Sequence, residues 1–174
     1  ELYNPANGFI HGRNADGSWT VLGSESSWTE DYAEGNARQY LWLAPQDPES
    51  LFALMGGEDA ALERLDELFE MMLEEDGEAT GVPENWYWHG NEPGLHIPYL
   101  FALAGDMEKT RRWVSWLMEN RYSTENDGLP GNDDGGTLSA WYVFSAMGLY
   151  PLAGTDRYVL GEPAFDRIGI PLGG

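Results

Sequence analysis

Apolar residues recur at helical spacing along six stretches of the chain, and polar stretches rich in glycine, asparagine and proline separate them. The clearest is 58–74, where leucine, phenylalanine and methionine share one side of the predicted helix and acidic residues occupy the other. The same spacing predicts five further helices, at 35–43, 48–55, 94–104, 106–120 and after Asp134.

Long polar loops join these helices, so the pattern predicts an all-α fold of antiparallel helical hairpins packed side by side. Three hairpins would form half of a ring, and a simple helical bundle is the alternative. In a row of hairpins, the loops at 28–36, 83–93 and 127–136 would gather at one end. Residues 1–30 hold closely spaced turn signals and are predicted to be irregular.

Composition narrows the classes of function that the chain can have. Thirty acidic residues against nine basic ones give a formal charge of −21, which argues against binding nucleic acid or an anionic membrane surface. No cysteine is present, so disulfides and thiolate metal sites are excluded. No apolar run approaches the roughly 18 residues of a membrane span. Neutral or cationic ligands are the classes that remain.

The first candidate site is the polar turn 130–136, which runs directly into the last predicted helix. It carries two adjacent carboxylates, Asp133 and Asp134. Asp134 stands at the predicted N-cap, where the positive end of the helix dipole favours an ionised carboxylate by roughly 0.3–1 kcal/mol. Such an acid is a base at neutral pH, although a capped core helix with a solvated turn explains the same residues.

Glu34 is the second candidate, because it lies among aromatic residues just before the first predicted helix. Aromatic surroundings disfavour the charged form of a carboxyl group and raise its pKa, as a general acid at neutral pH requires. The alternative is an ordinary glutamate at a helix N-terminus, where the dipole stabilises its charge.

The third candidate is the aromatic and polar run 86–93, which includes Trp88 and His89. Two indoles and a phenol close to a glycine are typical of a sugar-stacking platform and equally of a protein core. Asn91 and Glu92 offer oxygen ligands suited to a hard cation such as Ca²⁺. A zinc site is disfavoured, because the histidines here lack a third nitrogen or sulfur ligand.

The candidate residues favour a reaction carried out by carboxyl groups. The chain has no phosphate-binding glycine loop and no Gly-x-Ser-x-Gly nucleophile motif. One acid kept protonated and one kept ionised are the pair that hydrolyses a glycosidic bond. If Glu34 and Asp134 stand roughly 6.5–9.5 Å apart, a water fits between base and sugar, and the reaction inverts the anomeric configuration.

Five short motifs extend this picture along nearly the whole chain. They are Glu34-Gly35-Asn36-Ala37, Pro45-Gln46-Asp47, Met55-Gly56-Gly57, Gly90-Asn91-Glu92-Pro93 and Gly131-Asn132-Asp133-Asp134. In order and spacing they closely resemble glycoside hydrolase family 92. The resemblance implies a calcium-dependent, inverting exo-α-mannosidase that acts on mannose-containing glycans. It also implies a fragment, because members are several times longer and combine an N-terminal β-sandwich with a C-terminal (α/α)₆ barrel.

The resemblance implies roles for individual residues. Glu34 corresponds to the general acid and Asp134 to the general base, and Asn132 takes a catalytic position where many members have Asp. Asn91 and Glu92 match the segment that binds Ca²⁺. The residues expected to bind substrate are Trp88, His89, Gly90 and Asp133.

The resemblance also divides the chain into two parts. Residues 1–156 are expected to form part of the (α/α)₆ barrel, and residues 157–174 the start of a β segment with strands at 158–160 and 167–170. The missing β-sandwich is the expected partner within the parent chain, and a secreted, periplasmic or cell-surface location is expected from family habit. The alternatives are a non-catalytic carbohydrate-binding or degenerate fragment and a glycosidase of another (α/α)₆ family.

Overall fold

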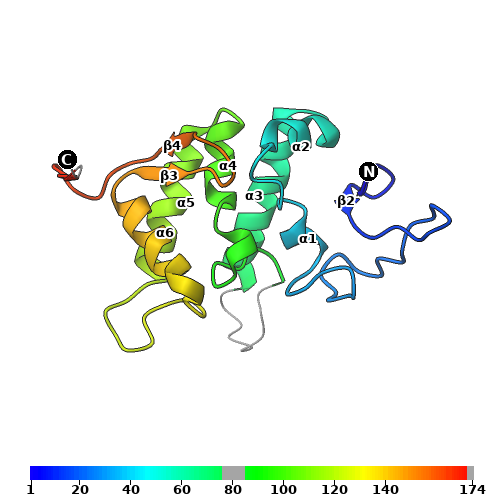
Figure 1. Cartoon of the computed structure of the whole chain (residues 1–174), viewed down its shortest axis with the longest axis horizontal. Coiled ribbons are helices and arrows are strands. Elements are labelled where there is room, and N and C mark those ends of the chain that lie inside the picture. Colours follow the sequence, from blue (N-terminus) through cyan, green and yellow to red (C-terminus); the bar gives the residue numbers. More distant parts are fainter. Residues whose placement is uncertain (76–84, 172–174) are drawn as a thin grey trace.

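The computed structural model describes residues 1–75 and 85–171, in which helices joined by long loops dominate (Figure 1). The helices, with η denoting a 3₁₀ turn, are α1 (Ala37–Tyr40), α2 (Pro48–Met55), α3 (Glu58–Glu75), η1 (Glu92–Gly94), α4 (Ile97–Leu103), α5 (Met107–Asn120), η2 (Asp134–Gly136) and α6 (Thr137–Ala146). The strands are β1 (Tyr3–Asn4), β2 (Phe9–Ile10), β3 (Leu149–Pro151) and β4 (Tyr158–Leu160). Among the described residues, no helix is both long and apolar enough to cross a membrane.

Side chains fix the ends of α2 and α5 close to where the sequence predicts them. Asp47 Oδ1 accepts a hydrogen bond from the Ser50 N–H (3.2 Å), which satisfies one free donor in the first turn of α2. Gly56 ends this helix with a φ of 110°, a left-handed conformation that favours glycine. Asp106 caps α5 in the same way, by accepting a hydrogen bond from the Lys109 N–H (3.0 Å).

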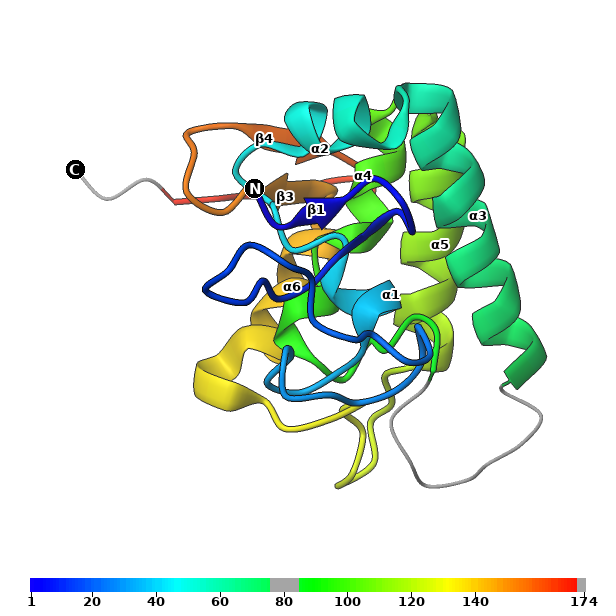
Figure 2. The ribbon, with the colours of Figure 1, turned by 90° about the vertical axis from the view of Figure 1, so that its right-hand side faces the viewer.

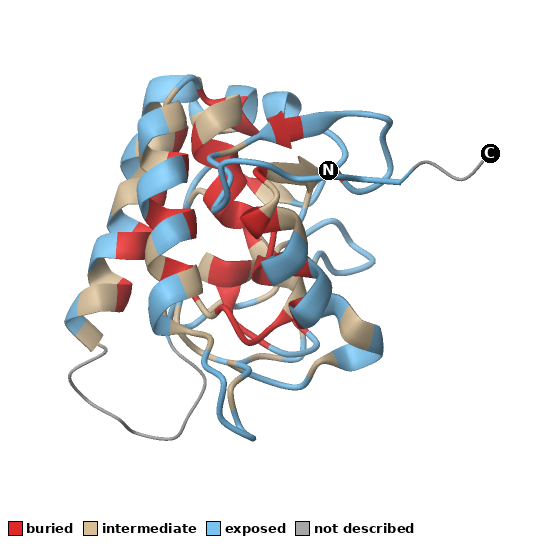
Figure 3. Cartoon of the chain, turned by 90° about the vertical axis from the view of Figure 1, so that its left-hand side faces the viewer, coloured by how far each residue is buried: buried red, intermediate tan, exposed pale blue. Residues whose placement is uncertain are grey.

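Helix α2 packs with α3, and α4 packs with α5, as two helical hairpins that share one core. Phe69 of α3 lies at the centre of this core and is fully buried. Its ring stacks on Tyr87 (centroids 4.4 Å apart) and makes tilted contacts with Trp113 (4.9 Å) and Phe101 (5.5 Å). Figure 3 shows the buried residues between the helices and the exposed residues on their outer sides. Aromatic packing between helices therefore places the loops at their ends.

The first predicted helix, at 35–43, is too long, because α1 has a single turn. After Tyr40 the chain bends through two short backbone hydrogen bonds, from Leu43 N–H to Tyr40 O (3.1 Å) and from Ala44 N–H to Trp42 O (2.7 Å). The proline that follows Ala44 disfavours helical backbone at the residue before it. In this bent conformation, Trp42 is buried in the core.

The N-terminal segment 1–30 is not wholly irregular, contrary to the prediction. Strands β1 and β2 form an antiparallel pair in which Tyr3 faces Ile10 and Asn4 faces Phe9. The turn between them contains Gly8, whose φ of 76° suits glycine and whose N–H donates to the Asn4 carbonyl (2.8 Å). A turn signal here marks the centre of a hairpin, which the prediction missed because each strand is only two residues long.

The second C-terminal strand, predicted at 167–170, does not form. Strand β4 pairs instead with β3, which precedes it in the chain, and the pairing places Tyr150 opposite Val159. Residues 167–170 are exposed and have no neighbouring strand among the described residues. The division of the chain at residue 156 stays a prediction, and residues 172–174 of the proposed β segment lie outside the described residues.

Candidate active site

The three loops predicted to carry the chemistry lie together at the lower end of Figures 1 and 2. The segment before α1 meets the segment before α4, since Asn91 Nδ2 donates a hydrogen bond to the Glu34 carbonyl oxygen (2.6 Å). The segment before α4 also meets the segment before α6. There the backbones of Gly90 and Gly131 pack so closely that a side chain on either would overlap the other loop. The predicted gathering of the loops is confirmed, and residues 83 and 84 lie outside the described part of the chain.

Glu34 is held through its backbone, while the residue as a whole is exposed. Its N–H donates to the Tyr40 hydroxyl (3.2 Å), and its carbonyl accepts from Asn91. Just after it, Asn36 and Gln39 form a capping box, in which each side-chain oxygen accepts the other's backbone N–H at 3.2 Å. The described residues fix the position of Glu34 but do not supply the aromatic burial expected around its carboxyl group.

Asn91 and Glu92 present oxygen atoms at the start of η1. Asn91 is buried and uses its Nδ2 on Glu34, which leaves its Oδ1 without a hydrogen bond among the described residues. Glu92 Oε1 is buried and likewise has no hydrogen-bond partner there. A buried carboxylate oxygen without a partner is costly, and a cation would satisfy it. The pair fits a hard cation, although the described residues contain no cluster of three or more His, Cys, Asp or Glu suited to a metal.

The N-cap residue of α6 is Gly136 and not Asp134, which corrects the prediction, and it is Asp133 that accepts a hydrogen bond from the first turn of the helix. Asp133 Oδ1 accepts from the Ser139 N–H (2.9 Å), and Oδ2 accepts from the Ser139 hydroxyl (2.7 Å). These two bonds, the backbone one first, favour the charged form and lower the pKa of Asp133. The helix starts only after Gly135 and Gly136, whose φ values of 70° and 87° are left-handed. Because of these two glycines, the turn does not enter the helix at Asp134.

Asp134 itself adopts a rare backbone conformation, with a φ of 30°. It is the one non-glycine residue with positive φ in the described part of the chain. Such conformations cost on the order of 1–3 kcal/mol and cluster at functional sites. The Thr137 hydroxyl donates to the Asp134 carbonyl (2.7 Å) and supports the turn. The residue is exposed and its carboxylate has no hydrogen-bond partner in the described residues, as is also true of the Asn132 side chain.

His89 lies almost wholly inside the protein and also lines the small cavity beside Trp88, so its contact with substrate stays a prediction. Only 1% of the residue is exposed. Its Nδ1 is hydrogen-bonded to the Tyr87 hydroxyl (2.6 Å) and its Nε2 to the Tyr122 hydroxyl (3.0 Å). Burial, and secondarily the positive charge of Arg121, lowers the pKa of His89 to about 3, so the imidazole is neutral. Both ring nitrogens are therefore engaged within the protein.

Trp88 and Trp28 form an aromatic edge at this end of the molecule. Their ring centroids are 6.5 Å apart at an interplanar angle of 37°, and Trp28 is half exposed. A cavity of about 220 Å³ lies beside Trp88, and His89, Gly90 and Pro130 also line it. Partly exposed indoles beside a cavity suit stacking on a sugar. The sugar platform stays a prediction.

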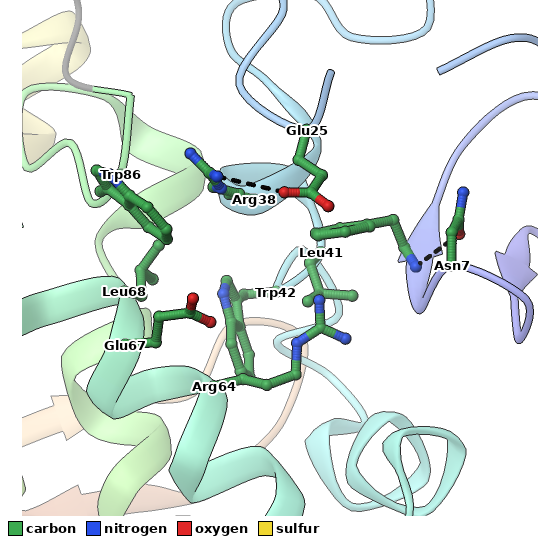
Figure 4. Close-up of a pocket in the computed structure, with 10 residues that line it drawn as sticks. Asn7, Glu25, Arg38, Leu41, Trp42, Arg64, Glu67, Leu68 and Trp86 are labelled. Carbon is green, nitrogen blue, oxygen red and sulfur yellow. Dashed lines mark hydrogen bonds and ion pairs between the residues drawn. The ribbon is translucent and has the colours of Figure 1, made fainter. Parts of the chain in front are cut away.

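A second cavity, of about 310 Å³, lies between the N-terminal segment, α1 and α3, and none of the predicted site residues lines it (Figure 4). The Arg38 guanidinium lies over the Trp86 ring, 3.6 Å from its centroid, and pairs with Glu25 (3.2 Å). Arg64 donates a hydrogen bond to the Gly8 carbonyl (2.6 Å). Both arginines bind groups of the N-terminal segment, so they connect that segment to the helices around the cavity. Since none of the predicted site residues lines it, this cavity is separate from the candidate active site.

Sequence reasoning misses two parts of this site. Tyr122 lies 33 residues from His89 along the chain, and no local pattern links the two. The anchoring of Glu34 by Asn36 and Gln39 was also missed, although the Asn-x-x-Gln spacing of a capping box in front of a helix would have indicated it.

Comparisons with known proteins assign a class to this fold and site. The α-mannosidase BT3965 of family GH92 from Bacteroides thetaiotaomicron is 34% identical, with a TM-score of 0.79 over 94% of this chain and 21% of that one. The inverting mannosidase BT2199 of family GH92 from the same organism is 32% identical, with a TM-score of 0.80 over 94% of this chain and 24% of that one. A curated relative from Arthroderma benhamiae, described as an uncharacterized secreted glycosidase, is 26% identical over 94% of this chain and 21% of its own length. In fold and sequence, the chain is therefore similar to a segment of these glycosidases.

The family follows from a match over the whole chain. Residues 1–174 match the family described as "Glycosyl hydrolase family 92 catalytic domain", and the chain belongs to that family. The resemblance is thereby confirmed, and a glycosidase of another (α/α)₆ family is excluded. The helical hairpins are confirmed as part of an (α/α)₆ barrel by their similarity to the two mannosidase structures. The chain spans about a fifth to a quarter of the length of the relatives it matches.

Proposed function

We propose that the parent protein, of which this chain is a segment, hydrolyses terminal α-linked mannose from glycans with inversion of configuration and with Ca²⁺ as cofactor. Family membership and the similarity to two mannosidases, one of them described as inverting, support the proposal. One structural observation supports assigning this function to named residues. The loops that bear Glu34, Glu92 and Asp134 meet at one end of the helical hairpins.

The proposed reaction uses Glu34 as general acid and Asp134 as general base. The Asp134 carboxylate takes a proton from the attacking water, whose oxygen bonds to the anomeric carbon. The Glu34 carboxyl group gives a proton to the glycosidic oxygen as its bond to that carbon breaks. Asp133 is less suited to be the base, because both of its oxygens accept hydrogen bonds from Ser139. Asn132, on the same turn, has no charge to contribute, and its amide would only orient the water.

The proposed Ca²⁺ would be held by Asn91 Oδ1 and Glu92 Oε1, and Glu92 Oε1 is buried without a hydrogen-bond partner in the described residues. Calcium takes about six to eight oxygen ligands, so others would come from water, sugar hydroxyls and parts of the parent outside this chain. Bound there, the ion would coordinate sugar hydroxyls and ease distortion of the ring. Asn91 also holds Glu34, so it would connect the metal segment to the acid.

The proposed substrate contacts are the partly exposed indole of Trp88 and the polar turn that contains Asp133. A secreted, periplasmic or cell-surface location is proposed, because the Arthroderma relative is described as secreted. The competing function is carbohydrate binding without turnover. It is favoured by the exposure of Glu34, which lacks in the described residues the burial that an acid at neutral pH requires.

The test compares variants of the complete parent protein in turnover of an aryl α-mannoside and in calorimetric titration with Ca²⁺. Glu34→Gln should lower kcat by about 100-fold or more while Ca²⁺ binding persists, since a general acid contributes on the order of 10²–10⁴-fold. Glu92→Ala should lose Ca²⁺ binding. Glu63→Gln, an exposed glutamate on α3, is the matched control.

Two outcomes would count against the proposal. Wild-type turnover by Glu34→Gln would refute the assignment of the acid. Ca²⁺-dependent mannose binding by the wild-type protein without any turnover would favour the non-catalytic alternative.

A further inference from the structure

A chain of hydrogen bonds crosses the interior directly behind the candidate site. His89 lies between the hydroxyls of Tyr87 (2.6 Å) and Tyr122 (3.0 Å), and these tyrosines come from different loops. The edge of its ring meets Trp141 of α6, with centroids 4.3 Å apart. Tyr122 in turn lies parallel to the same indole, at 5.8 Å and an interplanar angle of 2°. His89 is thus held by hydrogen bonds and by ring packing at the same time.

The donor and acceptor of each hydrogen bond follow from the last one in the row, between Tyr122 and Leu138. Tyr122 donates its hydroxyl proton to the Leu138 carbonyl oxygen (3.2 Å), so its oxygen accepts from His89 Nε2–H. A neutral imidazole carries one N–H, so Nδ1 accepts from the Tyr87 hydroxyl. Each hydroxyl and each ring nitrogen therefore has a defined donor or acceptor role. A buried polar network satisfied in this way holds its parts in one arrangement.

This row of hydrogen bonds connects the two loops of the candidate site, the segment of Gly90 and Asn91 and the turn of Asp133. On one side, His89 precedes Gly90, whose backbone packs against the loop of Pro130, and Asn91 comes next. On the other side, Leu138 lies in the first turn of α6, directly before the Ser139 that holds Asp133. A second hydrogen bond joins the same two sides, because Trp141 Nε1–H of α6 donates to the Leu95 carbonyl oxygen (2.8 Å) at the end of the segment that holds Asn91 and Glu92. Between the two loops themselves, the contact is packing of the Gly90 and Gly131 backbones.

We propose that His89 is a positioning residue, which acts through Tyr122 to fix the turn of Asp133 and Asp134 relative to the segment of Asn91 and Glu92. This role rests on the proposed function, since it concerns the distance between the base and the groups that bind the sugar. A group that fixes the residues in contact with metal or substrate, without touching either, typically affects affinity or activity by about 10–100-fold.

The test is Tyr122→Phe in the complete parent protein, which keeps the ring stacked on Trp141 but removes the hydroxyl between His89 and Leu138. The matched control is Tyr99→Phe, which also deletes a buried hydroxyl, bonded to Ser145 (2.7 Å) inside the core. Tyr122→Phe loses two hydrogen bonds and Tyr99→Phe loses one, so Tyr122→Phe should lose somewhat more thermal stability. We measure kcat and KM on an aryl α-mannoside, together with hydrogen–deuterium exchange of the segments 88–95 and 130–140.

Tyr122→Phe should lower kcat by about 10–100-fold with a smaller change in KM, and exchange should rise in both segments. Tyr99→Phe should leave kcat and the exchange of these segments near wild type. Equal effects in the two variants, or unchanged exchange in Tyr122→Phe, would overturn the positioning role. If the wild-type protein cleaves no mannoside, the proposed function fails, and the exchange comparison alone still decides whether His89 and Tyr122 fix the two segments.

Discussion

Substitution of Gly90 by alanine tests the closest contact between the two loops of the candidate site. A Cβ on Gly90 would overlap the carbonyl oxygen of Pro130. Its counterpart on Gly131 would lie 2.8 Å from the Gly90 Cα, whereas ordinary contacts begin at 3.4 Å, and would overlap the Gly90 carbonyl oxygen as well. The obstructing atoms belong to the backbone, so they cannot turn aside as the end of a flexible side chain would.

The expected magnitude follows from this overlap. Admitting a methyl group requires the loops to separate by about 1 Å. Overpacking of this kind costs roughly 1–3 kcal/mol of stability. A displacement of reacting groups by about 1 Å can lower a rate about 100-fold. Glu92 follows Gly90 on one loop, and Asp134 follows Gly131 on the other. We therefore expect Gly90→Ala to lower kcat by about 100-fold in the complete parent protein while it still folds.

The assay measures kcat and KM on an aryl α-mannoside and the thermal unfolding temperature for Gly90→Ala, Gly131→Ala and the double variant. Gly169→Ala is the control, because no atom would lie within 4 Å of its new Cβ. One separation of the loops relieves both overlaps, so the double variant should lose little more than the worse single variant. Wild-type kcat in Gly90→Ala would refute the reasoning, and strictly additive losses would show that the two glycines make independent contacts.

Two further predictions concern backbone strain and pH. Asp134→Gly should relieve the strain at a φ of 30° and raise the unfolding free energy by on the order of 1 kcal/mol, while turnover is lost. Asp134→Ala should lose turnover without that gain, and equal stability of the two variants in chemical denaturation would contradict the strain. His89 has its pKa lowered from 6.5 to about 3, so the unfolded chain takes up the proton first as pH falls. The folded state should lose about 2 kcal/mol between pH 7 and pH 5, with further loss down to about pH 3. Denaturation of wild type and His89→Asn at both pH values checks this, and an unchanged pH dependence in the variant would contradict it.

The helices that sequence predicts best are those whose signals are local. Helix α3 follows from its amphipathic spacing, and α2 and α5 follow from capping residues such as Asp47 and Asp106. The errors occur where distant contacts decide. Helix α1 ends after one turn because the bend buries Trp42 in a core made by other helices. Residues 167–170 have strand-like composition, but β4 already pairs with β3.

The sequence suggested a chemistry for the site, which stays a proposal, but it did not predict the contacts that form the site. Carboxylates beside glycine-rich turns pointed to glycosidic hydrolysis, and the family motifs gave roles to Glu34 and Asp134. The contacts that assemble the loops could not be predicted, because they join residues far apart in the chain, such as Asn91 with Glu34 and His89 with Tyr122. The family resemblance also gave His89 a contact with substrate. Only the tertiary structure shows that His89 is enclosed by tyrosines and an indole.

Asp133 and Asp134 are adjacent but differ in role, since Asp133 holds the start of α6 and Asp134 is the proposed base. A helix that started directly after Asp134 would use its carboxylate as the cap, and the proposed base would then be tied to backbone N–H groups. Gly135 and Gly136 prevent this, because they continue the left-handed backbone that Asp134 begins and so delay the start of α6. The Ser139 N–H in the first turn of α6 instead donates to Asp133, one residue before Asp134. The glycine pair thus leaves the Asp134 carboxylate available for its proposed role as base, and the strain at Asp134 is the cost of that arrangement.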